Sequence, residues 1–524
     1  MNWVYNAVAI MDAININPTE LMLVPLQIGA AIDLVFEPIN LALIVIGVVA
    51  GIVTGAIPGF TGSNAVAIAL PFTLVMEPHT ALIFMICIYA GAQYGSAIPA
   101  ILINTPGTAG AAATCLDAYP MSKQGKADDA IGISILASVI AGFLASIALL
   151  FFLPYIGDIA FQFTNPEIFV VTLFAIIIIA IALSDNVFKG LVAGLFGMIV
   201  AAMPLDPITG QNRLDFGFFE LYDEVPFIPV VIGLFAIAEL YYLANRDSIS
   251  MEDVEVGSYR QVLEGFRYTV QRPVEVVRGT ALGFSIGSLP GAGASFANFV
   301  AWVTAKNSSN DPDSFGEGNP DGVIASESAN NAVSAGALVP TLSLGIPGNS
   351  TTAVMLAALY LQGVQPGPQF LTEFAVEADA LVISLILAQF VLLVFAFAIS
   401  IYLVKVIMTP ASYLIPSIIV VTAIGAYAMR SLTFDIYLMV LFGIIAIMMK
   451  EHDYSVVPVI IGVIVGPIAE DSFRRSMLVT GNDPMVFFSS TITLVLWGGI
   501  LLTIFWRPIS TRIKNRIDFG EQVP

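Results

Sequence analysis

Long apolar stretches that contain no charged residue are the feature that most constrains the fold of this chain. Three of them cover residues 41–57, 131–154 and 380–404. Each approaches or exceeds the ~20 residues that an α-helix needs to cross a bilayer. Of the 524 residues, 57% are hydrophobic and 11% are charged, whereas a soluble domain has roughly 25% charged residues. The sequence therefore predicts an all-α polytopic membrane protein.

Further apolar segments, several of them interrupted by Gly or Pro, bring the expected total to about 12 to 15 membrane segments. They lie near residues 80–103, 168–183, 187–203, 226–244, 275–289, 323–343, 413–429, 434–449, 455–468 and 485–506. The N-terminus lacks a basic start, because Lys123 is the first Lys or Arg of the chain. We therefore expect insertion into the membrane without a cleavable signal peptide.

The distribution of basic residues predicts the orientation, because short cytoplasmic loops are enriched in Lys and Arg. Lys123 and Lys126 indicate that the loop after the third segment is cytoplasmic. Basic residues in 245–274 and in 508–524 indicate the same for these two segments. Counting the membrane segments between them predicts an extracytoplasmic N-terminus and a cytoplasmic C-terminus.

Two pairs of Pro-Gly motifs recur along the chain. TGAIPGFTGSN at 54–64 resembles IGSLPGAGASF at 286–296, and LINTPGTAGAAAT at 102–114 resembles LGIPGNSTTAVM at 344–355. The motifs come in the same order in each half, which indicates a duplication. We accordingly divide the chain into an N-terminal extension (1–35), a first repeat with its transmembrane bundle (36–244), a cytoplasmic polar linker (245–274), a second repeat with its bundle (275–507) and a cytoplasmic tail (508–524).

The second repeat is expected to be inverted relative to the first, because an odd number of predicted segments separates their starts. The loop after the second motif of the first repeat contains Lys123 and Lys126, whereas its counterpart, 362–379, contains acidic residues and no Lys or Arg. We therefore predict two inverted repeats with Pro-Gly-broken helices or re-entrant hairpins. This architecture is typical of secondary transporters, whose substrate site lies near the membrane midplane between the repeats.

The Pro-Gly motifs are also candidates for binding. Proline removes a backbone donor and interrupts the helix, so that amide and carbonyl groups at membrane depth need other partners. A half-helix that starts after such a break directs its N–H groups and its positive dipole end at the break, which suits a carboxylate. Neighbouring amide and hydroxyl side chains suit a dehydrated sodium ion.

The substrate-binding candidates are the polar and Pro-Gly residues of the second motif in each repeat, together with two asparagines expected to line the same cavity: Asn104, Thr105, Pro106, Gly107, Thr108, Asn330, Asn331, Gly345, Pro347, Gly348, Asn349, Ser350 and Thr351. The cation-binding candidates are Ser63, Asn64, Ser295 and Thr352. A single Pro-Gly motif is also compatible with an ordinary kink or surface turn, and recurrence in both halves argues against that. The small residues around Asn330 are also compatible with close helix packing. For Arg474 and Arg475 we prefer a structural role beside Glu470 or Asp471.

Other classes of function lack their signatures. Cys87 and Cys115 do not suggest a disulfide framework, and His79 and His452 have no metal-ligand spacing. No P-loop and no catalytic constellation of nucleophile and base is present. We expect no enzymatic activity, no cofactor, no metal centre and no nucleic-acid partner.

Three segments, at 89–132, 315–354 and 457–477, together with PGAGASFANF at 290–299, resemble the large membrane subunit of the tripartite tricarboxylate transporters. The resemblance covers most of the chain from about residue 40 to 507. The chain departs from the family pattern at Ala118, where Gly is usual in the Asp-Gly-Tyr-Pro motif, and at Ser326, where Pro is expected.

The resemblance implies cation-gradient-driven import of carboxylates such as citrate across a prokaryotic inner (plasma) membrane. It also implies a small four-helix membrane subunit and an extracytoplasmic solute-binding protein as partners. On this analogy, hairpins at 104–114 and 345–355 would form the carrier site and move in an elevator-like or rocking manner. Since no Lys or Arg lies in either hairpin, we expect coupling to Na+. The alternative is a passive anion channel or facilitator on the same scaffold, which is expected to show a continuous polar lining or rings of charge.

Overall fold

The computed structural model describes residues 24–57, 59–160, 163–182, 186–203, 213–214, 216–221, 225–245, 257–290, 293–367, 370–402 and 411–501. Within these residues all regular secondary structure is helical. Six helical segments there are long and apolar enough to cross a membrane: 38–55, 78–103, 127–155, 227–244, 375–402 and 433–451. Five shorter apolar helices accompany them in the described part of the chain. The prediction of an all-α polytopic membrane protein is confirmed, while the total of 12 to 15 segments stays a prediction.

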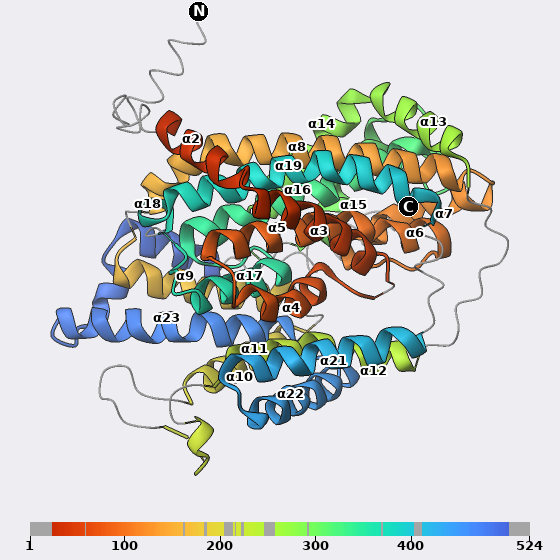
Figure 1. Cartoon of the computed structure of the whole chain (residues 1–524). Coiled ribbons are helices and arrows are strands. Elements are labelled where there is room, and N and C mark those ends of the chain that lie inside the picture. The colour runs from red at the N-terminus through yellow and green to blue at the C-terminus, as the bar shows by residue number, and fades with distance from the viewer. Residues whose placement is uncertain are drawn as a thin grey trace, which may run out of the picture.

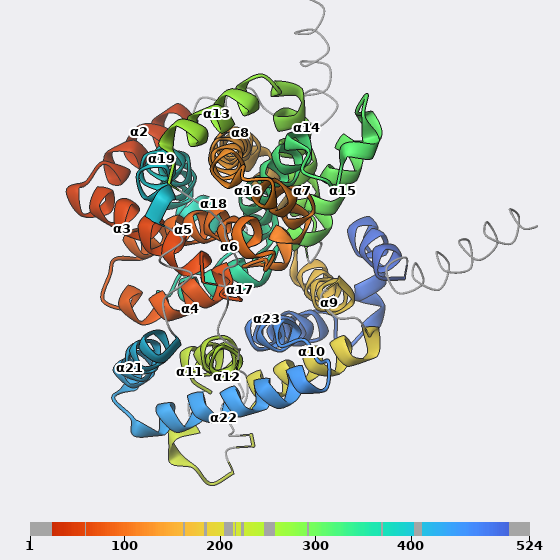
Figure 2. The ribbon, with the colours of Figure 1, turned by 90° about the vertical axis from the view of Figure 1, so that its right-hand side faces the viewer.

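The helices form two groups that pack against each other (Figures 1 and 2). The larger group contains α2 (Val24–Val35), α3 (Pro38–Gly55), α4 (Gly62–Thr73), α5 (Pro78–Gly95), α6 (Ala97–Ile103), η2 (Ala109–Ala111), α7 (Ala112–Lys123), α8 (Ala127–Ala160), α13 (Tyr259–Val270), α14 (Pro273–Gly287), α15 (Gly293–Ser308), η5 (Pro312–Ser314), α16 (Pro320–Leu344), α17 (Ser350–Leu361), α18 (Phe370–Glu373), α19 (Ala375–Ile399) and η6 (Ser400–Tyr402). The smaller group contains α9 (Asn165–Ala182), α10 (Val187–Ala201), η3 (Phe219–Leu221), α11 (Phe227–Ile232), η4 (Gly233–Ile237), α12 (Ala238–Ala244), α21 (Ala411–Arg430), α22 (Thr433–Glu451), α23 (Val457–Val479) and η7 (Pro484–Phe488). Helices α4 and α17 pack against the smaller group.

Glycines bring the backbones of two helix pairs into direct contact, one pair in each half of the chain. Between α3 and α5, a Cβ at Gly91 would lie 2.2 Å from the Val48 carbonyl oxygen. Between α14 and α16, a Cβ at Gly283 would lie 2.4 Å from the Ala329 carbonyl oxygen. Small residues permit this close approach. It matters in a membrane because apolar lipid leaves no hydrophobic driving force between helices, and close van der Waals packing stabilises their association instead. Both halves therefore place the helix before the first break against the long helix that leads to the second.

The segment predicted as a polar linker, 245–274, contains the amphipathic helix α13, which packs along α8. A Cβ at Gly265 of α13 would lie 2.3 Å from the Asp129 carbonyl oxygen of α8. Residues 246–256 of this segment lie outside the described residues, as do residues 1–23 of the N-terminal extension and the tail 508–524. The described end of the extension, α2, packs on α19.

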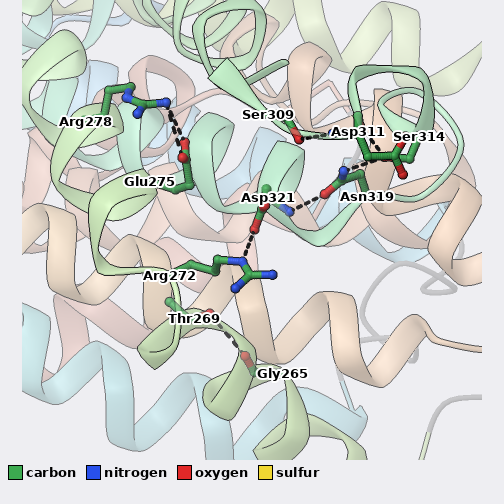
Figure 3. A network of polar contacts seen from close by, with 10 residues as sticks. All are labelled: Gly265, Thr269, Arg272, Glu275, Arg278, Ser309, Asp311, Ser314, Asn319 and Asp321. Carbon is green, nitrogen blue, oxygen red and sulfur yellow. Dashed lines mark hydrogen bonds and ion pairs between the residues drawn. The ribbon is translucent and has the colours of Figure 1, made fainter. Parts of the chain in front are cut away.

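The end of the linker is fixed to the start of α16 by the polar contacts drawn in Figure 3. Arg272, which follows α13, donates from Nε to Oδ1 of Asp321 at 2.9 Å. Asp321 is itself positioned because its backbone N–H donates to Oδ1 of Asn319 at 2.8 Å. Within α14, Arg278 pairs with Glu275 at 3.2 Å. These contacts set the position at which α16 enters the larger group.

Candidate functional site

Two helical hairpins share one backbone geometry. Hairpin 1 comprises α6, η2 and α7 (residues 97–123), and hairpin 2 comprises the end of α16 with α17 (residues 338–361). The first helix ends at a left-handed residue in each, Asn104 with φ 52° and Gly345 with φ 67°. The N–H of that residue donates to the carbonyl of a proline five positions earlier, Pro99 or Pro340.

The next N–H bonds to the same proline carbonyl at 3.2 Å in both hairpins. The two breaks are therefore closed by equivalent bonds, as a duplication requires. Sequence reasoning had singled out the Pro-Gly pair after each break. It had missed the earlier proline, although its constant distance from the break was a usable signal.

The tip of hairpin 1 lies against the ends of α3 and α5. The Thr108 hydroxyl donates to Oγ of Ser96 at 3.1 Å, and the Gly107 N–H donates to the Ser96 carbonyl at 3.2 Å. A Cβ at Gly107 would lie 2.7 Å from the Gly55 carbonyl oxygen. Asn104 is exposed, and Thr105 and Pro106 are half-buried. The tip is thus held by the buried Gly107 and the half-buried Thr108, while Asn104 stays exposed.

The tip of hairpin 2 is closed by the side chain of Asn349. Its Oδ1 accepts from the N–H groups of Thr351 and Thr352 at 3.0 Å, and the Thr352 hydroxyl accepts from the Asn349 N–H at 3.0 Å, which completes a capping box. Its Nδ2 donates to the Tyr89 hydroxyl of α5 at 2.6 Å. The Gly348 N–H donates to Oγ1 of Thr341 at 3.2 Å. Asn349 and Thr352 therefore position α17, and Gly345, Pro347 and Ser350 surround this tip.

Each hairpin packs against the broken helix of the other half of the chain. Hairpin 2 lies on α4, where a Cβ at Gly62 would be 3.1 Å from Oγ1 of Thr351. Hairpin 1 lies on α15, where Nδ2 of Asn298 donates to the Gly110 carbonyl at 2.7 Å. The candidate substrate residues of each half are thus brought beside elements of the other half.

The cation candidates Ser63 and Asn64 lie at the start of α4, next to hairpin 2. The Thr61 hydroxyl binds Oγ of Ser63 and Oδ1 of Asn64, both at 2.7 Å. Gly62, which lies between Thr61 and Ser63, faces Thr351 of α17. The side chain of Ser295 lies outside the described residues.

Asn330 and Asn331 are both buried on α16, but they face different neighbours. Consecutive helix positions are rotated by ~100°, so the two side chains bond to different helices, and their lining of one cavity stays a prediction. Oδ1 of Asn330 accepts from Nε2 of Gln93 at 2.8 Å and from Nδ2 of Asn298 at 3.0 Å. Asn331 instead faces α8, where its Nδ2 donates to Oγ of Ser138 at 2.6 Å. Sequence reasoning missed Gln93 and Asn298, which join α5 and α15 to Asn330.

Asp117 of α7 fixes the base of hairpin 1 to the loop between α15 and α16. Its Oδ1 accepts from the N–H groups of Gly316 at 2.8 Å and Asn319 at 2.8 Å, and its Oδ2 accepts from Nε1 of Trp302 at 2.6 Å. A Cβ at Gly322 would lie 2.0 Å from Oδ2 of Asp117. This buried carboxylate orders the segment 315–322, which carries part of the resemblance noted in the sequence.

A cavity of about 700 Å³ lies beside hairpin 2, between α9 and α23. Leu344, Tyr360 and Gln365 line its hairpin side, and Arg475 lines the opposite side. The expected ion pairs on α23 are confirmed: Arg475 bonds Asp471 at 2.7 Å, and Arg474 bonds Glu470 at 2.8 Å. Arg475 thus has a structural partner and also lines the cavity, a second role that a local motif did not reveal.

Comparison with known proteins identifies the chain. The profile of the tripartite tricarboxylate transporter TctA family matches residues 41–461. The chain belongs to this family. An uncharacterised 52.8 kDa protein in the TAR-I ttuC' 3' region of Agrobacterium vitis is 32% identical over 507 residues, which cover 95% of this chain and 99% of the relative. A second Agrobacterium vitis protein, in the TAR-II ttuC' 3' region, is 32% identical over 240 residues, which cover 46% of this chain and 99% of the relative. No solved structure matches the chain.

Membership of the TctA family makes the chain a membrane subunit of a tricarboxylate transporter. The family is one of transporters, which confirms the expectation that the chain is not an enzyme. It also makes the chain one component of a tripartite system. The apolar helices and the family together describe a multi-pass membrane protein.

Proposed function

We propose that the chain is the carrier subunit of a secondary active importer of di- and tricarboxylates such as citrate, coupled to Na+. The observation that carries this proposal is the pair of equivalent hairpins, each packed against the broken helix of the other half. Such paired breaks at a repeat interface provide backbone donors and acceptors inside a membrane protein. Inversion of the second repeat is part of the proposal.

The charge of the substrate is met by amides and by the coupling cation. The sequences of the two hairpins contain one basic residue, Lys123, which lies at the end of α7. The amides at the tip of hairpin 1 and the exposed Asn104 suit a carboxylate, since oriented N–H groups favour anions. A bound Na+ then balances the charge that these dipoles leave uncompensated, which explains why the cation and the anion would be transported together.

The cavity beside hairpin 2 supports a route for a small polyanion. Its volume of about 700 Å³ lies within the range of small-molecule sites, roughly 300–1,000 Å³. Arg475, Asn165 and Gln365 supply polar groups to its lining. We assign this cavity to the approach of the carboxylate toward hairpin 2.

The arrangement in the membrane completes the proposal. The chain would lie in the inner (plasma) membrane of a prokaryote with its N-terminus outside and its C-terminus in the cytoplasm. A small four-helix membrane subunit and an extracytoplasmic solute-binding protein would be its partners. Because α4 and α17 form contacts between the larger and the smaller helix group, an elevator-like or rocking motion would change the packing at these two helices.

The test is uptake of labelled citrate, and of a panel of smaller carboxylates, by proteoliposomes that contain this chain with its small membrane subunit. The binding protein and an inward Na+ gradient are each present or omitted. We expect uptake to require both and to fall in Asn104→Ala and Asn349→Ala variants that still insert. Equal uptake without Na+ at a fixed membrane potential would indicate that the coupling ion is H+ and not Na+. Uptake that ignores both the gradient and the binding protein would favour the channel or facilitator.

A further inference from the structure

Glu327 of α16 is a fully buried carboxylate surrounded by hydroxyl groups. Its Oε1 accepts from the Thr114 hydroxyl of α7 at 2.5 Å. Its Oε2 accepts from the Ser138 and Ser134 hydroxyls of α8 at 3.1 and 3.4 Å. Oγ of Ser326 lies 3.3 Å from Oγ1 of Thr114. We call these five residues the Glu327 cage. Its ligand atoms are hard oxygens contributed by α7, α8 and α16.

Two opposing effects act on the Glu327 carboxyl: complete burial disfavours its charged form, and the hydrogen bonds of the cage favour it. Hydroxyl groups that donate to a carboxylate favour its charged state. Asn331 strengthens this arrangement, because its Nδ2 donates to Oγ of Ser138 at 2.6 Å and so directs the Ser138 proton toward Glu327. Within the described chain no ion pair includes Glu327. A buried carboxylate that remains charged requires a cation, since charge without a partner is strongly unfavourable in a low-dielectric interior.

The Tyr94 hydroxyl of α5 provides an independent observation. Tyr94 is fully buried, and among the described residues its hydroxyl has no hydrogen-bond partner. Tyr94 lies on α5, which packs against α16, the helix that carries Glu327. Buried polar atoms without partners are rare in native proteins and call for a specific explanation, such as an ion at the site.

From these observations we infer that the Glu327 cage binds the coupling Na+ of the proposed transporter. The inference rests on the proposed function. One negative charge among neutral hydroxyl oxygens matches one monovalent cation, and hard cations prefer carboxylate and hydroxyl oxygens. On binding, the hydroxyl groups rotate so that their lone pairs face the ion. This site differs from the candidates Ser63, Asn64, Ser295 and Thr352, which lie at the first break of each half and at the start of α17.

The cage lies where an ion affects hairpin 1. Thr114 is four residues after Gly110, whose carbonyl accepts from Asn298 in the network of Asn330. Asn331, adjacent to Asn330, orients the cage. A cation held between Thr114 and Glu327 fixes α7 against α16 and thereby holds the tip of hairpin 1. Because a ligand shifts an equilibrium by its different affinity for the two states, this is a direct way to link cation and carboxylate binding.

The test measures Na+-dependent thermal stabilisation of the purified full chain, with choline replacing Na+ at constant ionic strength. We expect saturable stabilisation of the wild type, because a ligand that binds the folded state raises its stability. Glu327→Gln should abolish the Na+-dependent shift. Ser138→Ala should raise the half-saturating Na+ concentration about tenfold. Matched controls are Glu167→Gln, a buried carboxylate on α9, and Ser146→Ala, a buried serine that bonds the Gly142 carbonyl of its own helix.

The outcomes separate the cage from the transport function. Absence of a Na+ effect on the wild type, or wild-type half-saturation in both cage variants, would overturn the inference. A thermal stability that depends on pH but not on Na+ concentration, with the pH dependence lost in Glu327→Gln, would overturn the inference. It would indicate that Glu327 binds a proton and not Na+. Carboxylate uptake is measured in parallel. Loss of Na+ binding in the cage variants, with no uptake of any carboxylate by the wild type, would keep the cage and refute the proposed importer.

Discussion

The two hairpins have the same backbone break but satisfy their polar groups in different ways. In hairpin 2 the N–H groups at the tip find acceptors within the hairpin, through Asn349, Thr352 and Thr341. In hairpin 1 the short helix η2 leads directly into α7, and the Thr108 hydroxyl before η2 accepts from the Ala111 N–H at 3.3 Å. The tip N–H groups of hairpin 2 therefore use three side chains of that hairpin, whereas the side-chain acceptor at the tip of hairpin 1 is Thr108.

The two hairpins therefore differ in what holds their tips in place. Hairpin 2 is rigidified by its own side chains and by Tyr89. Hairpin 1 depends on Ser96, Asn298 and, through α7, on Thr114 for its position. The two hairpins thus share the geometry of the break and differ in the side chains that hold their tips.

The largest effect is expected from adding a methyl group at either tip. Ala at Gly107 meets the Gly55 carbonyl at 2.7 Å, and Ala at Gly348 meets Cα of Ala337 at 2.6 Å. Overpacking against backbone destabilises by about 1–3 kcal/mol, and we expect both variants to lose citrate uptake. Thermal unfolding and proteoliposome uptake measure the two effects. The control is Gly498→Ala, where a Cβ meets nothing within 4 Å. Normal uptake in Gly107→Ala would show that hairpin 1 has room to move aside.

Asn330→Ala is expected to disturb hairpin 1 and spare hairpin 2. It leaves the amides of Gln93 and Asn298 without their shared acceptor, a loss of about 1–3 kcal/mol. Hydrogen exchange should become faster in 104–114 and stay unchanged in 345–355. Equal acceleration of both segments would contradict the separate support of the two hairpins.

Asn349→Ala and Asn104→Gly should separate stability from ligand contact. Removal of the Asn349 cap should destabilise by about 1–2 kcal/mol. Gly at position 104 suits the observed φ of 52°, so stability should hold or rise slightly, because glycine adopts this conformation without a steric penalty. Uptake should nevertheless fall at least several-fold in Asn104→Gly, since the exposed amide is lost. Full uptake in this variant would remove Asn104 from the substrate site.

The smallest effect is expected for Tyr89→Phe. It removes the acceptor of the Asn349 Nδ2 bond across the two halves, a loss of about 1 kcal/mol. Hydrogen exchange should quicken at the start of α17 only, because Asn349 keeps its capping box. A change in hairpin 1 of similar size would mean that the two tips are coupled through α5.

The sequence by itself determined the membrane class and the places where helices break. Uncharged apolar stretches, the recurrent Pro-Gly motifs and the interior prolines Pro99 and Pro340 act locally, because they change which backbone groups can bond within their own helix. Contacts between residues far apart in the sequence could not be determined in this way. The capping box of Asn349 and Thr352 is local to α17, whereas the bond from Asn349 to Tyr89 is a contact that only tertiary structure provides.

Only the tertiary structure decided which polar residues meet. Thr114 and Ser138 lie 213 and 189 positions from Glu327 and still bond its carboxylate, and Gln93 lies 237 positions from Asn330. Glu327 in the sequence is one acidic residue beside two asparagines. Its chemistry depends on hydroxyl groups that α7 and α8 bring to it, because a buried charge is governed by the groups around it in space and not by its neighbours along the chain.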